Sequence, residues 1–217
     1  MEKTITVKGT GNISVTPDLT IISLTLKSLD KDYDKSMEEA SQKLSDLQDA
    51  ISEIGFAKTD LKTTRFNVST EYDSVRDKNG NYKSVFVGYS CIQGLKLEFD
   101  FDTKVLSKVL SAIARRIAEP ELNISFSVKD KAAVNEALLE SAAANAKKKA
   151  EILTKASGVK LGELININYS WAELDVYSDT RYDMEAKCMC ASDSVNMDIT
   201  PDDIEVGDSA TFIWAIE

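Results

Sequence analysis

Two cysteines near the end of the chain have the clearest potential for chemistry. Cys188 and Cys190 are separated by one residue, so their thiols could chelate a soft metal ion, or one could act as a redox-active thiolate. A closed metal site needs further ligands, yet the chain has no histidine and only one other cysteine, Cys91. Carboxylates nearby, such as Asp183, would disfavour the thiolate. Two hypotheses therefore stay open for Cys188 and Cys190. They form a metal- or redox-responsive module, or they lie in a loop and have no chemical role.

Neighbouring carboxylates are the second group with chemical potential. Asp202, Asp203 and Glu205 could bind a hard cation such as Ca²⁺, although carboxylates at the start of a strand are more often simply solvated. The absence of histidine removes the commonest general base, and no nucleophile elbow, phosphate loop or dinucleotide fingerprint occurs. The sequence thus predicts no catalytic, cofactor-binding or metal-binding residue set, and no cofactor.

The negative charge is concentrated at one end of the chain. The formal net charge is −10, and residues 173–217 contain 12 acidic and 2 basic side chains, so the rest is neutral. We interpret residues 173–198 as a long acidic loop, either solvated or used for interaction. Nucleic acid is excluded as a partner because its binding draws on a concentrated basic face.

Alternating apolar residues predict strands with one wet face over most of the chain. The longest alternation runs from Val85 to Phe99, and Asn79-Gly80 before it predicts a hairpin turn. Near the N-terminus, Gly9 and Gly11 predict a sharp reversal between two short strands. Cys91 falls on an apolar strand face and is expected in the core.

Three amphipathic helices should pack on this sheet. Apolar residues at helical spacing predict helices over residues 37–54, 105–117 and 131–156. The third carries alanines at the centre of its inner face, which would let it approach a neighbour closely. Its Lys147-Lys148-Lys149 triplet could bind phosphate but is more simply a solvated face near the helix C-terminus. The predicted class is α+β: two layers, antiparallel sheet of about eight strands, and three helices.

Four blocks in this order resemble the SIMPL-domain family, formerly a domain of unknown function. The first block is I-x-V-x-G-x-G-x-x-x-V-x-P-D, from Ile5 to Asp18. The second is Ile124, Phe126 and Val128 before an alanine-rich helix, and the third is Gly158 followed by Leu161-Gly162. The fourth is Ile199-Thr200-Pro201 leading into the last strand. The resemblance covers nearly the whole chain, and residues 173–198 are its least typical part.

The resemblance implies a protein without established catalytic residues. It implies bacterial members that often sit in the cell envelope, are associated with stress tolerance or immunogenicity, and in some cases form large homo-oligomers. We therefore expect a non-enzymatic protein that self-associates or binds a protein partner. Alternatives are the metal or redox module on Cys188 and Cys190, and a small-molecule binder or enzyme with a sheet-lined pocket.

The organisation predicted is a single domain over residues 1–217. Its N-terminal half, residues 1–100, should have the order β-β-β-α-β-β, and its C-terminal half, residues 101–217, the order α-β-α-β-β with the acidic loop 173–198. No membrane-spanning segment is predicted. The sequence as written shows no secretory signal, so it predicts a cytoplasmic location, with the envelope as the alternative if a signal has been removed.

Overall fold

The chain folds into two compact units, each built from a sheet and the helices that lie on it. The computed structural model describes residues 3–76, 80–116, 121–170, 175–184 and 199–217. The first unit comprises Met1–Asp18, Ser127–Asp179 and Pro201–Glu217, and the second comprises Leu19–Phe126 and Thr180–Thr200. Over the described residues there are three α-helices and eight strands in two sheets, and the predicted α+β class is confirmed.

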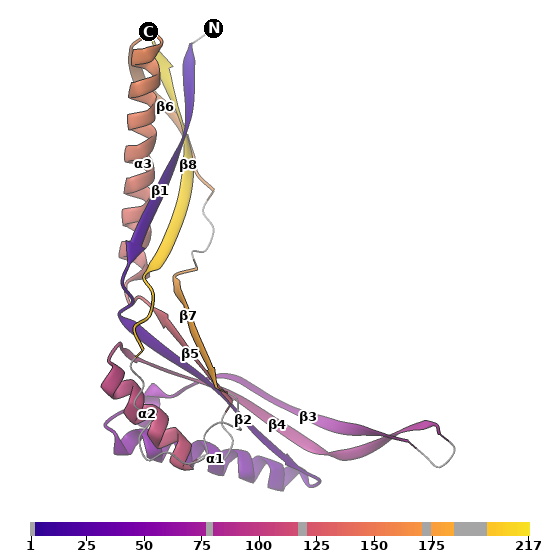
Figure 1. The fold of residues 1–217 in the computed structure, drawn as a ribbon. Coiled ribbons are helices and arrows are strands. Elements are labelled where there is room, and N and C mark those ends of the chain that lie inside the picture. The colour runs from indigo at the N-terminus through magenta and orange to yellow at the C-terminus, as the bar shows by residue number, and fades with distance from the viewer. Residues whose placement is uncertain (1–2, 77–79, 117–120, 171–174, 185–198) are drawn as a thin grey trace. The chain divides into compact units, whose positions relative to one another are not determined.

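The first unit is a three-stranded sheet with one long helix along it (Figure 1). The strand order is β1-β8-β6, and the elements are β1 (Thr4–Val15), α3 (Lys131–Ala156), β6 (Leu161–Asn168) and β8 (Ile204–Ile216). β1 and β8 are antiparallel along their whole length. α3 has the bounds that the sequence predicts, because the Asp130 carboxylate accepts a hydrogen bond from the Ala133 N–H at 2.8 Å and caps its N-terminus.

The predicted reversal at Gly9 and Gly11 is wrong, because both glycines lie inside the continuous strand β1. A Cβ atom on Gly9 would collide with the carbonyl oxygen of Ala142, and one on Gly11 with the carbonyl oxygen of Leu138. The two glycines therefore serve the close approach of α3 to β1. As a result, the N-terminal half has two strands before its first helix instead of the predicted three.

The second unit is a five-stranded sheet with two helices packed against it. Its strand order is β3-β4-β2-β5-β7. The elements are β2 (Leu19–Asp30), α1 (Tyr33–Glu53), the short 3₁₀ helix η1 (Lys58–Asp60), β3 (Lys62–Arg76), β4 (Tyr82–Asp100), α2 (Thr103–Arg116), β5 (Glu121–Ser127) and β7 (Tyr177–Met184). β2 and β3 both pair antiparallel with β4.

One large apolar core holds this second unit together. It joins the inner faces of the sheet to α1 and α2, and its fully buried members include Ile22, Leu47, Ile51, Leu95, Leu97, Leu106, Leu110, Ile113, Ile124 and Phe126. In the first unit, one core cluster uses small residues where α3 meets the sheet, with Ala146, Ala150 and Ala210 beside Val7, Phe212 and Trp214.

The acidic segment contains a strand that the sequence did not predict. Residues 173–198 were expected to form a loop, but Tyr177–Met184 is β7, at the edge of the five-stranded sheet. This strand has few large apolar residues, because an edge strand needs little apolar surface. Its sequence therefore lacks the alternation of apolar residues that predicts a strand. Residues 171–174 and 185–198 lie outside the described ranges.

Candidate association surface

Among the described residues, the most exposed aromatic side chains lie on the hairpin of β3 and β4. The two strands pair from Lys62 opposite Lys96 to Arg76 opposite Tyr82. The antiparallel pairing of these two consecutive strands confirms the hairpin that Asn79-Gly80 predicts, and Gly80 has φ +86°. We call residues 66–76 and 82–89 the arm. In Figure 1 this two-stranded ribbon extends beyond the other strands of the second unit.

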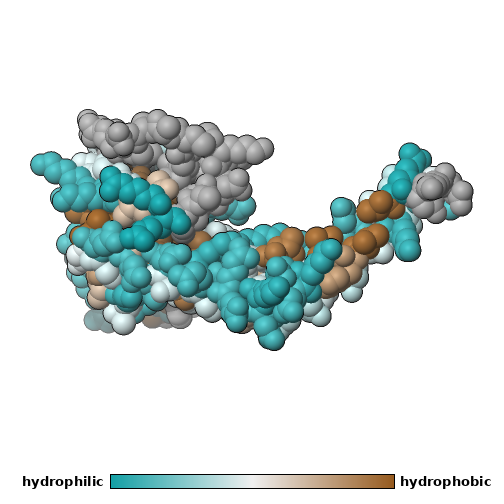
Figure 2. Space-filling view, turned by 90° about the horizontal axis from the view of Figure 1, so that it is seen from below, coloured by the Kyte–Doolittle hydropathy of each residue, from teal (hydrophilic) through white to brown (hydrophobic). Residues whose placement is uncertain are grey.

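Large apolar side chains along the arm stand open to solvent. The exposed fractions are 74% for Tyr82, 60% for Tyr72, 52% for Phe66 and 38% for Phe86. Figure 2 shows hydrophobic residues gathered along the arm, between more hydrophilic stretches. With about 200 Å² for each aromatic side chain, the exposed parts of these four rings add up to roughly 450 Å². That is within the size of the largest apolar patch on a typical monomer, about 300–600 Å², and such patches are often functional.

The rings form a continuous series that begins at α1. Tyr33, the first residue of α1, makes an edge-to-face contact with Tyr89, with ring centroids 5.6 Å apart. Tyr89 contacts Phe86 at 5.4 Å, and Phe86 contacts Tyr72 at 5.6 Å. Near the tip, the Arg76 guanidinium lies over the Tyr82 ring, 5.8 Å from its centroid.

A register shift keeps these rings on one face of the arm. Glu71 lies opposite Gly88, whereas the next residue, Tyr72, lies opposite Phe86, so Val87 is an extra residue in β4. Such a bulge resets the alternation of side chains on the bulged strand. Phe66, Tyr72, Tyr82, Phe86 and Tyr89 therefore share the sheet face on which α1 lies further along, and we call this set the aromatic face.

The helix is too short to cover that face. α1 has 21 residues, which at about 1.5 Å per residue is roughly 30 Å. β4 has 19 residues, which at about 3.3 Å per residue is roughly 60 Å. The alternation over Val85–Phe99 predicts one apolar and one wet face, but it does not show how far a helix covers the apolar one. Comparing these two lengths would have revealed it.

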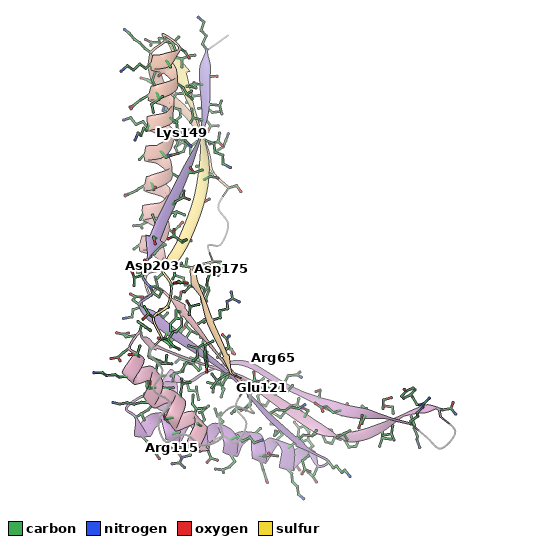
Figure 3. The ribbon with its side chains drawn as sticks, viewed as in Figure 1. Arg65, Arg115, Glu121, Lys149, Asp175 and Asp203 are labelled. Carbon is green, nitrogen blue, oxygen red and sulfur yellow. The ribbon has the colours of Figure 1, made fainter. Side chains whose placement is uncertain are left out.

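The outer edge of β3 is also open. Over the described ranges β3 is the terminal strand of its sheet, with β4 as its neighbour. The terminal strand β1 differs, because side chains of α3 reach its edge. The Thr10 N–H donates to Asn145 Oδ1 at 3.1 Å. Lys149, labelled on α3 in Figure 3, donates from Nζ to the Lys8 carbonyl oxygen at 3.1 Å.

Of the residues predicted as candidates for chemistry, the carboxylates lie within the described ranges and the two cysteines do not. Cys188 and Cys190 lie outside the described residues, so the metal or redox hypothesis stays a prediction. Asp202, Asp203 and Glu205 are exposed, and the described part of the chain contains no group of three or more side chains able to hold a metal ion.

Two further predictions concern single residues. Cys91 is fully buried, as predicted, and burial raises the pKa of its thiol against the opposing effect of a hydrogen bond with Ser28. In the lysine triplet, Lys147 and Lys148 are exposed, whereas Lys149 is partly buried against β1. A phosphate site at the triplet stays untested. For the small-molecule alternative, the described residues offer a hollow on α1 lined by Met37, Glu38, Ser41 and Gln42, which has no cluster of groups suited to chemistry.

The fold and this surface define an α+β protein that, within the described ranges, exposes an aromatic face on a long hairpin. The chain belongs to the SIMPL family: the family model, described as a protein of unknown function (DUF541), matches residues 5–214. The resemblance stated from the sequence is thereby confirmed. Within the described ranges, no helix has both the length and the apolar character to span a membrane.

Two curated relatives have the same name, 26 kDa periplasmic immunogenic protein. One is from Brucella melitensis and the other from Brucella abortus. Each is 28% identical to this chain over 167 residues, which cover 76% of this chain and 65% of the relative. The match thus spans slightly less than two thirds of the length of these relatives.

Proposed function

We propose that this protein is not an enzyme and works by associating with further copies of itself through the arm. The observation that carries the proposal is the aromatic face, whose rings at Phe66, Tyr72, Tyr82 and Phe86 stay exposed to solvent. Exposed rings on a rigid hairpin lose little conformational freedom on binding, which is why aromatic residues are enriched in interfaces.

The area of the aromatic face fits one side of a protein interface. A standard interface covers about 800 Å² on each partner, of which about 56–65% is non-polar. The roughly 450 Å² offered by four rings is close to the lower end of that non-polar share. A second copy presenting the same arm would supply a matching surface.

The names of the relatives favour the cell envelope as the place of action. Both Brucella proteins are called periplasmic, which supports the envelope alternative over the cytoplasmic location first expected. Fractionation of cells that express the native gene tests this: recovery in the osmotic-shock fluid is expected, and recovery with cytoplasmic markers would contradict it. A role in stress tolerance stays an implication of the family.

Light scattering after size exclusion tests the association. The full chain is expected to elute with a mass of at least two copies at micromolar concentration. The double variant Tyr72→Ser/Phe86→Ser should shift towards the monomer, because it removes two neighbouring rings of the aromatic face.

The matched control removes exposed apolar side chains from the other unit. Leu164 and Ile167 on β6 are 47% and 49% exposed, so Leu164→Ser/Ile167→Ser changes a similar amount of exposed surface away from the arm. The mass should stay that of the unchanged protein. A monomer for the full chain, or a loss of mass in the control alone, would contradict association through the arm.

A further inference from the structure

We propose that two copies pair the outer edges of their β3 strands, antiparallel, about a two-fold axis that passes through Ser69. This inference rests on the proposed self-association and specifies its geometry. The partner is a second copy of this chain, and the paired segment is residues 65–73.

The segment is suited to strand addition. Residues 65–73 contain no proline or glycine, and Val68 and Thr70 favour extended backbone. An unpaired strand edge presents N–H and C=O groups that can form a ladder with another chain. The segment has a natural end, because the register shift between Thr63 and Arg65 makes Thr64 an extra residue in β3, and such a bulge bends the strand there. The pairing therefore stops before the lysine at position 62.

The charges on this edge complement each other in one register. Lys27 pairs with Glu71 at 2.8 Å within the same copy, so that carboxylate is already matched. Arg65 and Asp73 are exposed, and neither forms an ion pair within the described part of the chain. With Ser69 on the two-fold axis, Arg65 of each copy lies opposite Asp73 of the other, so the attractive pair occurs twice.

The same register matches the aromatic residues. Phe66 lies opposite Tyr72 of the second copy, again twice, on the sheet face that carries the other rings. Aromatic pairs directly opposite each other on neighbouring strands stabilise antiparallel pairing. The two aromatic faces would then join into one surface across the dimer.

Neighbouring registers match less well. An axis through Val68 puts Arg65 opposite Glu71, whose carboxylate already forms an ion pair with Lys27. It also puts Tyr72 opposite Thr64, where the register shift in β3 occurs. An axis through Thr70 puts Arg65 opposite Val75. A slip by a single residue would bring opposite faces together, which strand pairing does not allow.

A cysteine on the axis tests the register. In the full chain carrying Cys188→Ser and Cys190→Ser, Ser69→Cys should form an intermolecular disulfide under mild oxidation, because directly opposed strand residues lie within disulfide reach. Asn67→Cys in the same background is the matched control. Its counterpart in this register is Glu71, so two copies of that cysteine lie too far apart. Cross-linking of Asn67→Cys, or none by Ser69→Cys, would overturn the register.

A charge exchange tests the ion pairs. Arg65→Glu alone and Asp73→Arg alone each create two like-charged pairs, so each should weaken the dimer at least tenfold. Mixing the two variants restores both attractive pairs, so a mixed dimer with near-original affinity is expected. Lys83→Glu on β4, which makes the same change of charge away from the outer edge, should leave the affinity unchanged. Equal weakening by Lys83→Glu, or no rescue on mixing, would overturn the ion pairs.

These tests separate the inference from the proposed function. If Tyr72→Ser/Phe86→Ser lowers the mass but Ser69→Cys does not cross-link, association through the arm stands and edge pairing fails. If the full chain is a monomer in every measurement, both fail together.

Discussion

The contact between α3 and β1 and the surface of the arm are both sheet surfaces, but they use opposite kinds of side chain. Where α3 lies on β1, the strand presents glycine and the helix presents Ala142 and Ala146, so the backbones approach closely. On the arm, the sheet presents aromatic rings: α1 contacts Tyr89 through Tyr33, whereas Tyr72 and Tyr82 further along stay exposed. Small residues thus occur where a helix of the same chain already packs on the sheet. Large exposed rings occur where the sheet surface is available to another chain.

The edges of the two sheets differ in the same way. Asn145 and Lys149 of α3 reach the edge of β1, which protects it from pairing with another chain. The edge of β3 has no such cover over the described ranges. The predictions below alter one side of this comparison at a time.

The largest effect is expected from adding one methyl group to the α3–β1 contact. Glycine to alanine in a strand ordinarily stabilises by about 0.5–1 kcal/mol. At Gly9 the new Cβ would also lie only 2.7 Å from the Cβ of Ala146. Gly9→Ala should therefore destabilise the first unit by roughly 3 kcal/mol, a fall of about 6–12 °C in the melting temperature measured by circular dichroism.

Gly207→Ala is the control for that measurement. Gly207 lies in β8 of the same sheet, and its added Cβ would meet the end of the flexible Asn12 side chain at 2.9 Å. That side chain can move, so the change should stay within about 1 kcal/mol of the unchanged protein. An equal loss at both positions would refute the tight packing of α3.

Sequence patterns predicted the elements well because helical and strand periodicities reflect burial directly. α3 was predicted with its observed bounds, and the Asn79-Gly80 hairpin was confirmed. The reversal predicted at Gly9 and Gly11 was wrong because glycine occurs both in tight turns and where a helix approaches a strand closely. What decides between them is the partner 130 or so residues later in the chain, which local spacing does not show.

The candidate surface was harder to predict than the fold. Phe66 and Tyr72 alternate as core residues do, and only the reach of α1 decides that they stay exposed. The bulge at Val87 places Phe86 beside Tyr89 on the same sheet face. The alternation of apolar residues does not predict this bulge. Whether a strand face is buried therefore depends on how far the neighbouring helix extends along it, and not on the sequence of the strand alone.

The second prediction separates stability from association on the arm. Phe86→Ser removes a ring that is 38% exposed in the monomer. Because roughly 120 Å² of that ring is buried, the unfolding free energy should fall by about 2–3 kcal/mol. The dissociation constant should rise about tenfold or more, because the ring would be buried between copies. Urea unfolding of a dilute sample gives the first quantity and analytical ultracentrifugation the second. A large loss of stability without a change in association would assign the ring to the core.

The third prediction concerns the protected edge of β1. Asn145→Ala leaves the Thr10 N–H without its 3.1 Å acceptor, although solvent can replace it at this exposed position. We expect a loss of about 0.5–1 kcal/mol in unfolding free energy, together with faster amide exchange at Thr10. Ala144→Ser on an exposed position of the same helix should change neither quantity.

The smallest effect is a pH dependence at the base of the arm. The hydrogen bond from Lys27, 2.8 Å away, contributes most to holding the pKa of the Glu71 carboxyl below its ordinary value of 4.5. Ser90 contributes next and the charge of Lys27 least, against a partial desolvation that raises this pKa. A lowered pKa in the folded state means that the pair adds stability above about pH 4.5 and that this part is lost as pH falls through the folded value. Because Glu71 is open to solvent, the effect is small and screened by salt. The urea midpoint of Lys27→Gln should lie slightly below that of the unchanged protein at pH 7 and converge with it at pH 3, whereas Lys104→Gln should follow the unchanged protein throughout. A difference that persists at pH 3 would show that Lys27 stabilises the strand by packing and not through the charge of Glu71.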